Sequence, residues 1–466
     1  NAPRQRIVML PAADELRRSI SDGGGNSSNS GCISTVSSSS AKSADQQKME
    51  NEFSMDRLRH HCRTCLSKAW ATADSSEISI VPVRLYSGGG LSNYLFVASL
   101  ADSVQPQAGQ PNRVLIRVFG EILSNNAESV VLDSVIFALL SEKRMGPHLY
   151  GVFKGGRIEE FVANSAPLRR QQMAEPLIHG IISKHLARLH RLEMPLSKEP
   201  RFVFKMMQSW LRSVKEVVSG KTDREEPPPR PGFNATPVAR FLRDFRVHEE
   251  IDWLRDAFYN QLSSPVVFCH NDLQENNILK FDNASRQHGF SLQLIDFEYC
   301  SYNWRAFDIG NFFNEWTLDY TPSEWPYFSY HPDCYPSPEA QLTFWRSYLR
   351  WYSEPEIDHK VPLFPTQESS DCRDVAGADT VADDVEVATA PETNNAVAGS
   401  EADAALLLEA KYGALMSHFF WSVWSLLQAS VSSIHFDFKE YAQLRFRLYA
   451  KLKEEITGKP SGLPVQ

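Results

Sequence analysis

Apolar positions in the first third of the chain recur with the two periods that distinguish helices from strands. Between Met55 and Trp70 they lie three or four residues apart, which predicts a helix. Further along, alternating or continuous apolar runs predict strands, and one run at helical spacing predicts a helix at 130–140. The expected strands cover residues 78–85, 94–100, 112–118, 149–153 and 157–161. This pattern indicates a β-rich N-terminal lobe at 55–163.

After Pro167 the apolar spacing becomes predominantly helical. Helices are expected at 177–192, 202–218 and 241–262, and a proline-rich surface loop at 221–237. Two short apolar runs, 266–269 and 292–295, predict strands. The chain is therefore predicted to be α+β, with a mainly helical C-terminal lobe formed by residues 164–364 and 404–456.

Two segments have the composition of disordered chain. Residues 1–54 are rich in Ser, Gly and Asn, and residues 365–403 are rich in Ala, Asp, Thr and Val. The second segment contains ten acids and one base, while the whole chain has a net charge of −9. Removing those ten acids and one base leaves acids and bases in equal number. The acidity therefore belongs to a predicted disordered insertion, and a broadly basic nucleic-acid-binding surface is not expected.

The cysteines and the apolar runs favour a cytoplasmic protein. Seven cysteines in 466 residues form no disulfide framework and are expected to be reduced thiols. The longest apolar run, 414–427, is interrupted by polar residues and is shorter than the ~18 residues of a membrane span. Zinc binding by the His and Cys residues of segment 60–65 is an alternative, but their spacing favours a helix with buried thiols.

The most informative segment joins the two predicted strands of the second lobe. The strand at 266–269 leads into His270, Asn271 and Asp272, and Asn277 follows five residues after Asp272. The strand at 292–295 leads into Asp296 and then Phe, about twenty residues further on. Protein kinases use the same layout of a catalytic-loop Asp, an Asn and a metal-binding Asp.

Phosphoryl transfer explains why these residue types occur at this spacing. The reaction needs a group that orients the attacking hydroxyl and accepts its proton, and hard oxygen ligands for Mg²⁺. We therefore predict Asp272 as the base, with Asn277 and Asp296 as ligands of Mg²⁺. The alternative is that two unrelated strand ends carry polar turn residues, which is hard to reconcile with all four positions in this order.

A glycine-rich loop and an arginine in the first lobe are candidates for binding ATP. The loop between the first two strands would bring backbone N–H groups close to phosphates, although an ordinary hairpin turn has the same composition. Arg117 lies in the third strand, where kinases place a phosphate-binding Lys, and its expected partner is Asp133 or, alternatively, Glu128. The predicted phosphate-binding residues are Gly89, Gly90, Ser92, Asn93 and Arg117.

Segment 295–316 and the loop His270–Asn277 together resemble the choline and ethanolamine kinase family. The resemblance runs from about Cys62 to Leu452 and is interrupted by the acidic insertion. It implies a two-lobed, protein-kinase-like fold and an enzyme that uses ATP and Mg²⁺ to phosphorylate an amino alcohol. It also implies a homodimer that feeds phosphatidylcholine synthesis.

The resemblance further implies a site for a quaternary ammonium group, which cannot donate hydrogen bonds and is stabilised by aromatic faces. Trp421 and Trp424 lie on one face of a predicted helix, although such spacing is also typical of a buried core. The implied choline-binding residues are Gln274, Tyr299, Glu315, Tyr320, Trp421, Trp424, Phe436 and Tyr441. Gln274 and the pair Glu315-Trp316 favour choline over ethanolamine.

Two residues depart from the family pattern. Glu160 stands where the family has Gln in the segment that links the lobes and would contact adenine together with Val162. An ionised Glu only accepts hydrogen bonds, so backbone groups would serve instead. Asp133 stands where the family has Glu. Three further interpretations compete: an ethanolamine kinase, an aminoglycoside-type kinase on the same fold, and a pseudokinase or scaffold without turnover.

Overall fold

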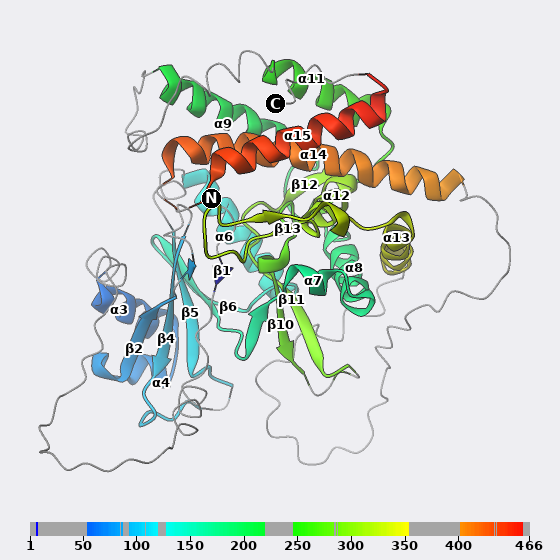
Figure 1. Ribbon diagram of the computed structural model, residues 1–466. Coiled ribbons are helices and arrows are strands. Elements are labelled where there is room, and N and C mark those ends of the chain that lie inside the picture. The colour runs from blue at the N-terminus through cyan, green and yellow to red at the C-terminus, as the bar shows by residue number, and fades with distance from the viewer. Residues whose placement is uncertain are drawn as a thin grey trace, which may run out of the picture.

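The structure is a computed structural model of the chain (Figure 1). The structure describes residues 6–7, 54–83, 85–86, 93–107, 109–119, 127–219, 246–283, 286, 288–353, 401–432, 434 and 436–459. Most of the predicted tail, the proline-rich loop and most of the predicted insertion lie outside these ranges.

A five-stranded antiparallel sheet forms the centre of the N-terminal lobe, at the lower left of Figure 1. Its strands, in spatial order, are β2 (Ile78–Pro82), β4 (Asn93–Leu100), β5 (Arg113–Phe119), β7 (Gly156–Glu160) and β6 (Leu149–Phe153). The helices of this lobe are α3 (Met55–Cys65), α4 (Ala69–Thr72) and α6 (Ala127–Glu142). Buried Trp70, Phe96 and Ile116 belong to the core between the sheet and the first two helices. The predicted β-rich lobe is therefore confirmed.

Two predicted elements of this lobe are divided in the structure. The helix expected from Met55 to Trp70 ends at Cys65 and restarts at Ala69, because Lys68 has a positive φ of 55° that a helix cannot contain. The strand expected at 78–85 ends at Pro82, and Leu85–Tyr86 form a separate strand, β3. That strand pairs with β1 (Arg6–Ile7), two residues of the tail that was predicted to be disordered.

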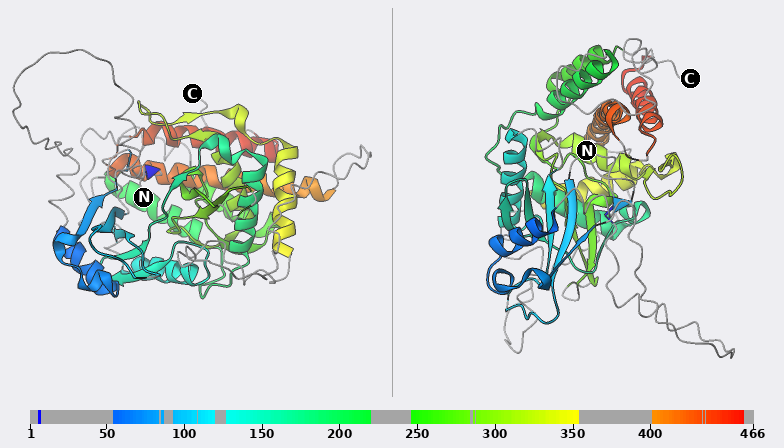
Figure 2. Two further views of the ribbon diagram at one scale, coloured as in Figure 1. Left: turned by 90° about the horizontal axis from the view of Figure 1, so that it is seen from below. Right: turned by 90° about the vertical axis from the view of Figure 1, so that its left-hand side faces the viewer.

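The C-terminal lobe contains most of the helices and short two- and three-stranded sheets. Its helices of eight or more residues are α8 (Pro176–His190), α9 (Phe202–Ser219), α11 (Val247–Asp256), α12 (Arg305–Glu315), α13 (Pro338–Ser353), α14 (Glu401–Val431) and α15 (Phe438–Thr457). Figure 2 shows α9, α14 and α15 above the sheet of the N-terminal lobe, in the view at its right. The helical prediction is confirmed in outline. However, helix 241–262 begins in the described residues at Val247 and ends as a π-turn, Ala257–Gln261. The insertion predicted to reach 403 ends earlier, because α14 begins at Glu401.

Two glycines allow α12 and α14 to pack with their backbones in direct contact. A Cβ atom on Gly310 would lie 2.1 Å from the backbone N of Ala414, and one on Gly413 would lie 1.6 Å from the carbonyl O of Ala306. Any side chain at either position would therefore force the helices apart. This close packing matters for the site, because α12 ends at Glu315 and α14 carries Trp421 and Trp424.

Short strands position the loops between the helices. β9 (Val266–Cys269) pairs with β12 (Ser301–Trp304), while β11 (Phe290–Leu294) pairs with β10 (Ile278–Asp282), which also pairs with β8 (Ser165–Pro167). The predicted strands correspond to β9 and β11, but their partners β10 and β12 were not predicted. Within the part of the chain that the structure describes, no helix has the length and apolarity required to span a membrane.

Candidate active site

The loop after β9 brings Asp272 and Asn277 into direct contact. Both side chains are buried, and Asn277 Nδ2 donates to the backbone carbonyl and to Oδ2 of Asp272, each at 2.9 Å. The 3₁₀ turn Glu275–Asn277, which begins directly after Gln274, makes this contact possible across five residues. Because its Nδ2 faces Asp272, Asn277 turns its Oδ1 away from the Asp272 carboxylate.

One buried carboxylate, Asp308 on α12, holds the backbone of this loop. Its Oδ2 accepts a hydrogen bond from the backbone N–H of His270 at 2.7 Å, and its Oδ1 accepts one from the backbone N–H of Asn271 at 2.6 Å. His190 Nε2, at the end of α8, lies 3.0 Å from Asp308 Oδ2, and His190 Nδ1 lies 2.9 Å from the hydroxyl of Tyr348 on α13. Three helices therefore support the position of the loop that carries Asp272.

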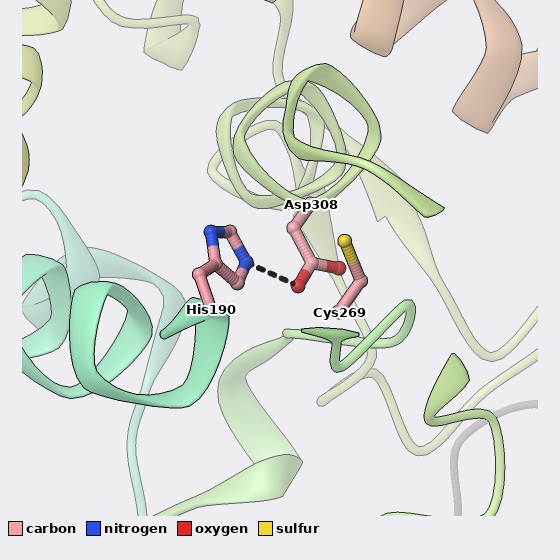
Figure 3. A group of neighbouring side chains, drawn as sticks. All are labelled: His190, Cys269 and Asp308. Atoms are coloured by element: carbon pink, nitrogen blue, oxygen red, sulfur yellow. Dashed lines mark hydrogen bonds and ion pairs between the residues drawn. The ribbon is translucent and has the colours of Figure 1, made fainter. Parts of the chain in front are cut away.

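Figure 3 shows His190, Cys269 and Asp308, whose potential ligand atoms lie within 4.8 Å of one another. Both Asp308 oxygens already accept backbone hydrogen bonds. Burial raises the pKa of the Cys269 thiol well above its usual value, and burial lowers the pKa of His190 despite the hydrogen bond to Asp308. We interpret this cluster as a support for the loop, with a neutral imidazole and a thiol, rather than as a metal centre.

Asp296 reaches the same region from the end of β11. The backbone N–H of Ile295 donates to the carbonyl of Asn277 at 3.0 Å, which ties the end of the strand to the loop. Asp296 itself has a left-handed φ of 65°, a conformation that costs a non-glycine residue about 1–2 kcal/mol. Its side chain is 32% exposed, in contrast to the buried Asp272. A carboxylate oxygen of Asp296 and the Oδ1 of Asn277 are the hard donors that Mg²⁺ prefers.

Glu298 is a further carboxylate near this group, two residues after Asp296. Burial and then the negative charge of Asp296 raise the pKa of Glu298 to about 8. Such a shift indicates that the two acids repel each other and that a cation here would be stabilised. Glu298 lies within the predicted motif, but no role was predicted for it.

Arg117 lies between the lobes, but its partners differ from those predicted. Its Nε donates to Glu159 Oε1 at 3.2 Å, and its Nη1 lies 3.8 Å from Asp296 Oδ1. Burial lowers the pKa of Arg117, but Glu159 and then Asp296 outweigh this effect and raise it above its usual range. The guanidinium therefore connects β5 to the end of β11.

The predicted pairing of Arg117 with Asp133 is wrong, because Asp133 pairs with Arg157, while Arg117 pairs with Glu159. Arg157 forms a hydrogen-bonded ion pair with Asp133 on α6, and its Nε donates to Glu159 Oε2 at 2.8 Å. Glu159 thus bridges two arginines, and its pKa is lowered because their charges outweigh the cost of burial. The side chain of Glu128, the alternative partner, lies outside the described residues.

The remaining ATP-binding predictions concern two regions. Gly89, Gly90 and Ser92 lie outside the described residues, as does the side chain of Asn93. Glu160 ends β7, and its Oε2 accepts a hydrogen bond from the backbone N–H of His148 at 3.0 Å. Val162 is buried in a small apolar cluster with Leu279, the second residue of β10, and Ile295, which follows β11 directly.

Most of the predicted ammonium-binding side chains form one aromatic cluster, made of Tyr299, Tyr320, Trp421, Trp424, Phe436 and Tyr441. These residues come from two widely separated parts of the chain, 299–320 and 421–441, and each is at most 7% exposed. The indole rings of Trp421 and Trp424 are nearly perpendicular with centroids 5.6 Å apart, and Tyr299 contacts Trp421 edge-on at 5.4 Å. The cluster is also part of the largest apolar core in the described residues. Trp421 and Trp424 are therefore consistent both with a substrate-binding site and with a buried core.

A buried carboxylate, Glu315, lies at the edge of the aromatic cluster. Its Oε1 accepts a hydrogen bond from Arg445 Nη2 at 2.9 Å, and its Oε2 accepts one from the Tyr320 hydroxyl at 3.1 Å. The hydroxyls of Tyr320 and Tyr441 are 2.8 Å apart. Arg445 is fully buried on α15 and stacks over the Tyr441 ring at 5.3 Å. The charge of Glu315 is therefore balanced within the protein.

The side chain of Asn311 connects the aromatic cluster to the catalytic loop. Its Oδ1 accepts a hydrogen bond from Trp421 Nε1 at 2.9 Å, while its Nδ2 donates to the carbonyl of Leu273 at 3.3 Å. Leu273 follows Asp272 directly, and Asn271 Nδ2 donates to the carbonyl of Tyr299 at 2.9 Å. Two hydrogen-bonded connections thus place the cluster beside the loop.

Several residues of the site were missed by sequence reasoning. Asp308 and Asn311 lie inside the signature at 295–316, so their identities were visible but their contacts were not. His190, Glu159 and Arg445 had no signal, because a single charged or imidazole side chain on a predicted element is usually on the surface.

Two-lobed architecture and the loop with Asp272, Asn277 and Asp296 define the class of protein-kinase-like phosphotransferases. A model of the choline/ethanolamine kinase family matches residues 86–450. The chain belongs to this family.

Relatives of the chain include choline kinases, ethanolamine kinases and choline/ethanolamine kinases. It is 38% identical over 400 residues to a choline/ethanolamine kinase of Mus musculus, covering 86% of each chain. It is 34% identical to choline kinase alpha of Mus musculus, covering 85% of this chain and 80% of the relative. With ethanolamine kinase 1 of Mus musculus the identity is 29%, over 81% of this chain and 85% of the relative.

Solved structures support the same fold. A choline kinase from Cryptosporidium parvum matches with a TM-score of 0.61 and 25% identity, covering 88% of this chain and 98% of that chain. An ethanolamine kinase from Plasmodium vivax matches with a TM-score of 0.54 and 20% identity, covering 89% and 96%. The predicted fold class is therefore confirmed.

Proposed function

We propose that the protein phosphorylates choline with ATP as co-substrate. The observation that carries this proposal is the connection through Asn311, which joins the aromatic cluster to the backbone next to Asp272. A cation seated against the cluster would present a hydroxyl on a short chain to that carboxylate. The similarity to a choline kinase and to a choline/ethanolamine kinase supports the same substrate.

Asp272, Asn277 and Arg117 have separate roles in the proposed reaction. Asp272 orients the hydroxyl of choline and accepts its proton, while Asn277 Nδ2 holds the carboxylate in position. Arg117 contacts the phosphates, and Glu159 prevents its guanidinium from turning away. The adenine would lie against the apolar cluster of Val162, Leu279 and Ile295.

The donors near Asp296 fit Mg²⁺, since amide and carboxylate oxygens are available there without nitrogen or sulfur ligands. Asn277 Oδ1 and Asp296 would hold the ion. Glu298, whose pKa is raised to about 8, would become negatively charged when a bound cation lowers that pKa. Bound Mg²⁺ neutralises charge on the phosphates of ATP.

Two features support choline over ethanolamine. The Glu315 carboxylate is already engaged by Arg445 and Tyr320, so it offers few free acceptor positions to a primary ammonium with three N–H donors. The aromatic faces, in contrast, suit a trimethylammonium group, which is attracted without hydrogen bonds. The site therefore compensates choline for its lost hydration better than it compensates ethanolamine.

A homodimer in the cytoplasm is also part of this proposal. Val131, Leu132 and Val135 on α6 are between 39% and 62% exposed and form an apolar face that a second copy would cover. The five cysteines in the described residues are free thiols, as expected in a reducing compartment.

An ATP-coupled assay with choline, ethanolamine and an aminoglycoside side by side tests the proposal. We expect kcat/KM for choline to exceed that for ethanolamine by about tenfold or more, which is the contribution of roughly 1.4 kcal/mol of cation–π contact. Chelation of Mg²⁺ with EDTA should stop the reaction. Preference for ethanolamine or for the aminoglycoside would refute the substrate assignment.

A further inference from the structure

A cavity lies beside the Glu315–Arg445 pair. It has a volume of about 430 Å³ and is formed by α14, α15 and the segment from Tyr330 to Gln341. Its lining includes Asn314, which precedes Glu315 in the sequence, and His418, which is hydrogen-bonded to Arg445. None of the residues assigned to the proposed reaction lines this cavity.

The floor of the cavity is polar, although it is buried. Asn314, Thr317, Gln341 and His418 are each at most 8% exposed. Arg445 Nη1 lies 3.1 Å from His418 Nδ1, so Nδ1 acts as the acceptor and the proton is on Nε2. Burial, and then the charge of Arg445, lowers the pKa of His418 well below its usual value, which keeps the ring neutral. The floor therefore provides an N–H donor.

The same floor contains an acceptor whose hydrogen-bonding capacity is unused. Asn314 Nδ2 donates to the Ala414 carbonyl at 2.9 Å and to Ser417 Oγ at 3.2 Å, which fixes the orientation of the amide. Within the described residues, Asn314 Oδ1 has no donor, although the side chain is 1% exposed. Buried polar atoms are usually satisfied, and one that is not suggests a ligand group. A single hydroxyl could accept from His418 and donate to Asn314.

The walls and the rim of the cavity differ from its floor. Tyr330, Tyr335, Pro336 and Leu452 provide apolar and ring-shaped surfaces for a flat body. At the rim, Lys411 is paired with Glu455 at 2.7 Å. Lys451 is exposed at the same rim and forms no ion pair with the described residues. From floor to rim, the cavity therefore offers a site for a hydroxyl group, an apolar slot and the positive charge of Lys451.

We propose that this cavity binds a small aromatic hydroxy acid, with its hydroxyl at His418 and Asn314 and its carboxylate at Lys451, and that binding changes the affinity of the enzyme for choline. The route of coupling is short, because His418 contacts Arg445 and Arg445 holds Glu315. A hydroxyl that binds His418 would alter the position of Arg445 and hence of the carboxylate at the aromatic cluster. The coupling part of the proposal rests on the proposed function, whereas the binding part does not.

Direct binding to the full chain, without substrates, is measured first by isothermal titration and ligand-observed NMR with 4-hydroxyphenylacetate. Phenylacetate lacks the hydroxyl, and 4-hydroxyphenylethanol lacks the carboxylate. We expect saturable binding of 4-hydroxyphenylacetate and at least tenfold weaker binding of each analogue. Equal binding of all three compounds, or no saturable binding of 4-hydroxyphenylacetate, would overturn the site.

Variants then locate the binding. Leu452→Trp, at the partly exposed wall, should fill the slot, and Lys451→Glu should remove the rim charge. Each is expected to weaken binding at least tenfold, whereas Lys439→Glu, an exposed change on the same helix, should not. Unchanged binding by Leu452→Trp with a normal melting temperature would place the ligand elsewhere. If Leu452→Trp is unstable, the binding affinities of Lys451→Glu and Lys439→Glu are sufficient to show whether the ligand occupies this cavity.

Kinetics test the coupling separately. Saturating 4-hydroxyphenylacetate should change the KM for choline at least threefold and leave the KM for ATP unchanged, and this effect should vanish in Lys451→Glu. Coupling is reciprocal. Choline should therefore change the affinity for 4-hydroxyphenylacetate by the same factor by which 4-hydroxyphenylacetate changes the affinity for choline. Binding without any change in choline affinity would refute the coupling. An enzyme that binds the compound but does not phosphorylate choline would refute the proposed function and leave the site intact.

Discussion

The catalytic loop and the aromatic cluster lie side by side but are built in opposite ways. The loop places Asp272 and Asn277 in contact across five residues, through hydrogen bonds whose partners are mostly backbone atoms. The aromatic cluster brings together Tyr299, Tyr320 and Tyr441 from separate elements, through ring contacts within the largest core. One region is specified by a local motif, and the other depends on how α12, α14 and α15 pack.

This difference determines what a substitution should do in each region. A side chain of the loop can be exchanged for an isostere without creating a cavity, so its chemical role can be removed alone. A ring of the aromatic cluster contributes to binding and to the core at once, so its removal should affect both. Measurements that separate turnover, substrate affinity and stability are therefore the appropriate test of the comparison.

The largest effect is expected from Asp272→Asn. The amide keeps the shape of the carboxylate and can still accept the hydrogen bond from Asn277, but it cannot take a proton from the substrate. We expect kcat to fall about 10³-fold, with little change in the melting temperature or in ATP binding. The control is Asp282→Asn, an exposed position at the end of β10. Turnover within tenfold of the unmodified enzyme would remove Asp272 from the role of base.

A second, smaller effect should follow Trp424→Ala in the aromatic cluster. Loss of the indole should raise the KM for choline about ten- to thirtyfold, since ~1–2 kcal/mol of cation–π contact disappears, with the KM for ATP unchanged. The cavity should also cost about 3–5 kcal/mol of stability. Trp210→Ala is the matched control, because this buried Trp packs on Phe420 in the same core.

The two variants together separate binding from packing. Both should melt at lower temperature, but only Trp424→Ala should weaken choline binding, and Trp424→Phe should weaken it less. A normal KM for choline in Trp424→Ala would mean that the ring is only part of the core, and the preference for choline would lose its main support.

The sequence predicted the loop better than the cluster for a physical reason. The spacing from Asp272 to Asn277 and the strand before Asp296 are local, so a motif contains them. Glu159 and Arg445 act through partners 42 and 130 residues away, and no periodicity identifies such a pairing. For the same reason Asp133 was paired with the wrong arginine: both arginines, on neighbouring strands β5 and β7, face the same carboxylates.

The fold shows the same division. Strands β9 and β11 were predicted from their apolar runs, whereas β10 and β12 were not. β10 directly follows the catalytic loop, and β12 lies within the signature at 295–316. Both are only four to five residues long and gain their stability from pairing. The membership of Trp421 and Trp424 in a substrate site came from the family resemblance, because their spacing alone also fits a core.

His190 tests how far the loop depends on its support. In His190→Phe the ring shape remains, but the hydrogen bond to Asp308 is lost. We expect kcat to decrease about tenfold with both KM values unchanged, because Asp308 would hold the loop backbone less firmly. Tyr348→Phe, which removes the outer hydrogen bond, should have a smaller effect. His179→Phe, on the same helix against Trp316 and Phe344, should leave kcat unchanged. A normal kcat in His190→Phe would limit His190 to stability.

Both regions contain a buried neutral imidazole, and acid should therefore weaken both. Burial lowers the pKa of His190 and His270 at the loop, and of His418 beside Arg445; it lowers the pKa of His185 on α8 to about 3. The unfolded chain, with ordinary values near 6.5, binds more protons below that pH than the folded chain does. The contribution of these histidines to stability should therefore be complete above pH 6.5 and fall as the pH decreases.

The smallest expected effect is the contribution of one histidine to the pH dependence of the stability. At pH 5 His185 alone should account for a loss of about 2 kcal/mol, from 1.36 kcal/mol per pH unit below 6.5. Glu298 acts in the opposite direction, since its folded-state pKa is about 8 and its stabilisation is lost as the pH rises through that value. The several histidines outweigh this one acid between pH 5 and 7, so the melting temperature should increase with pH in that range. His418→Gln should flatten the increase, whereas His60→Gln, at an exposed position, should not. A melting temperature that is constant from pH 5 to pH 7 would show that these imidazoles are not held neutral in the folded protein.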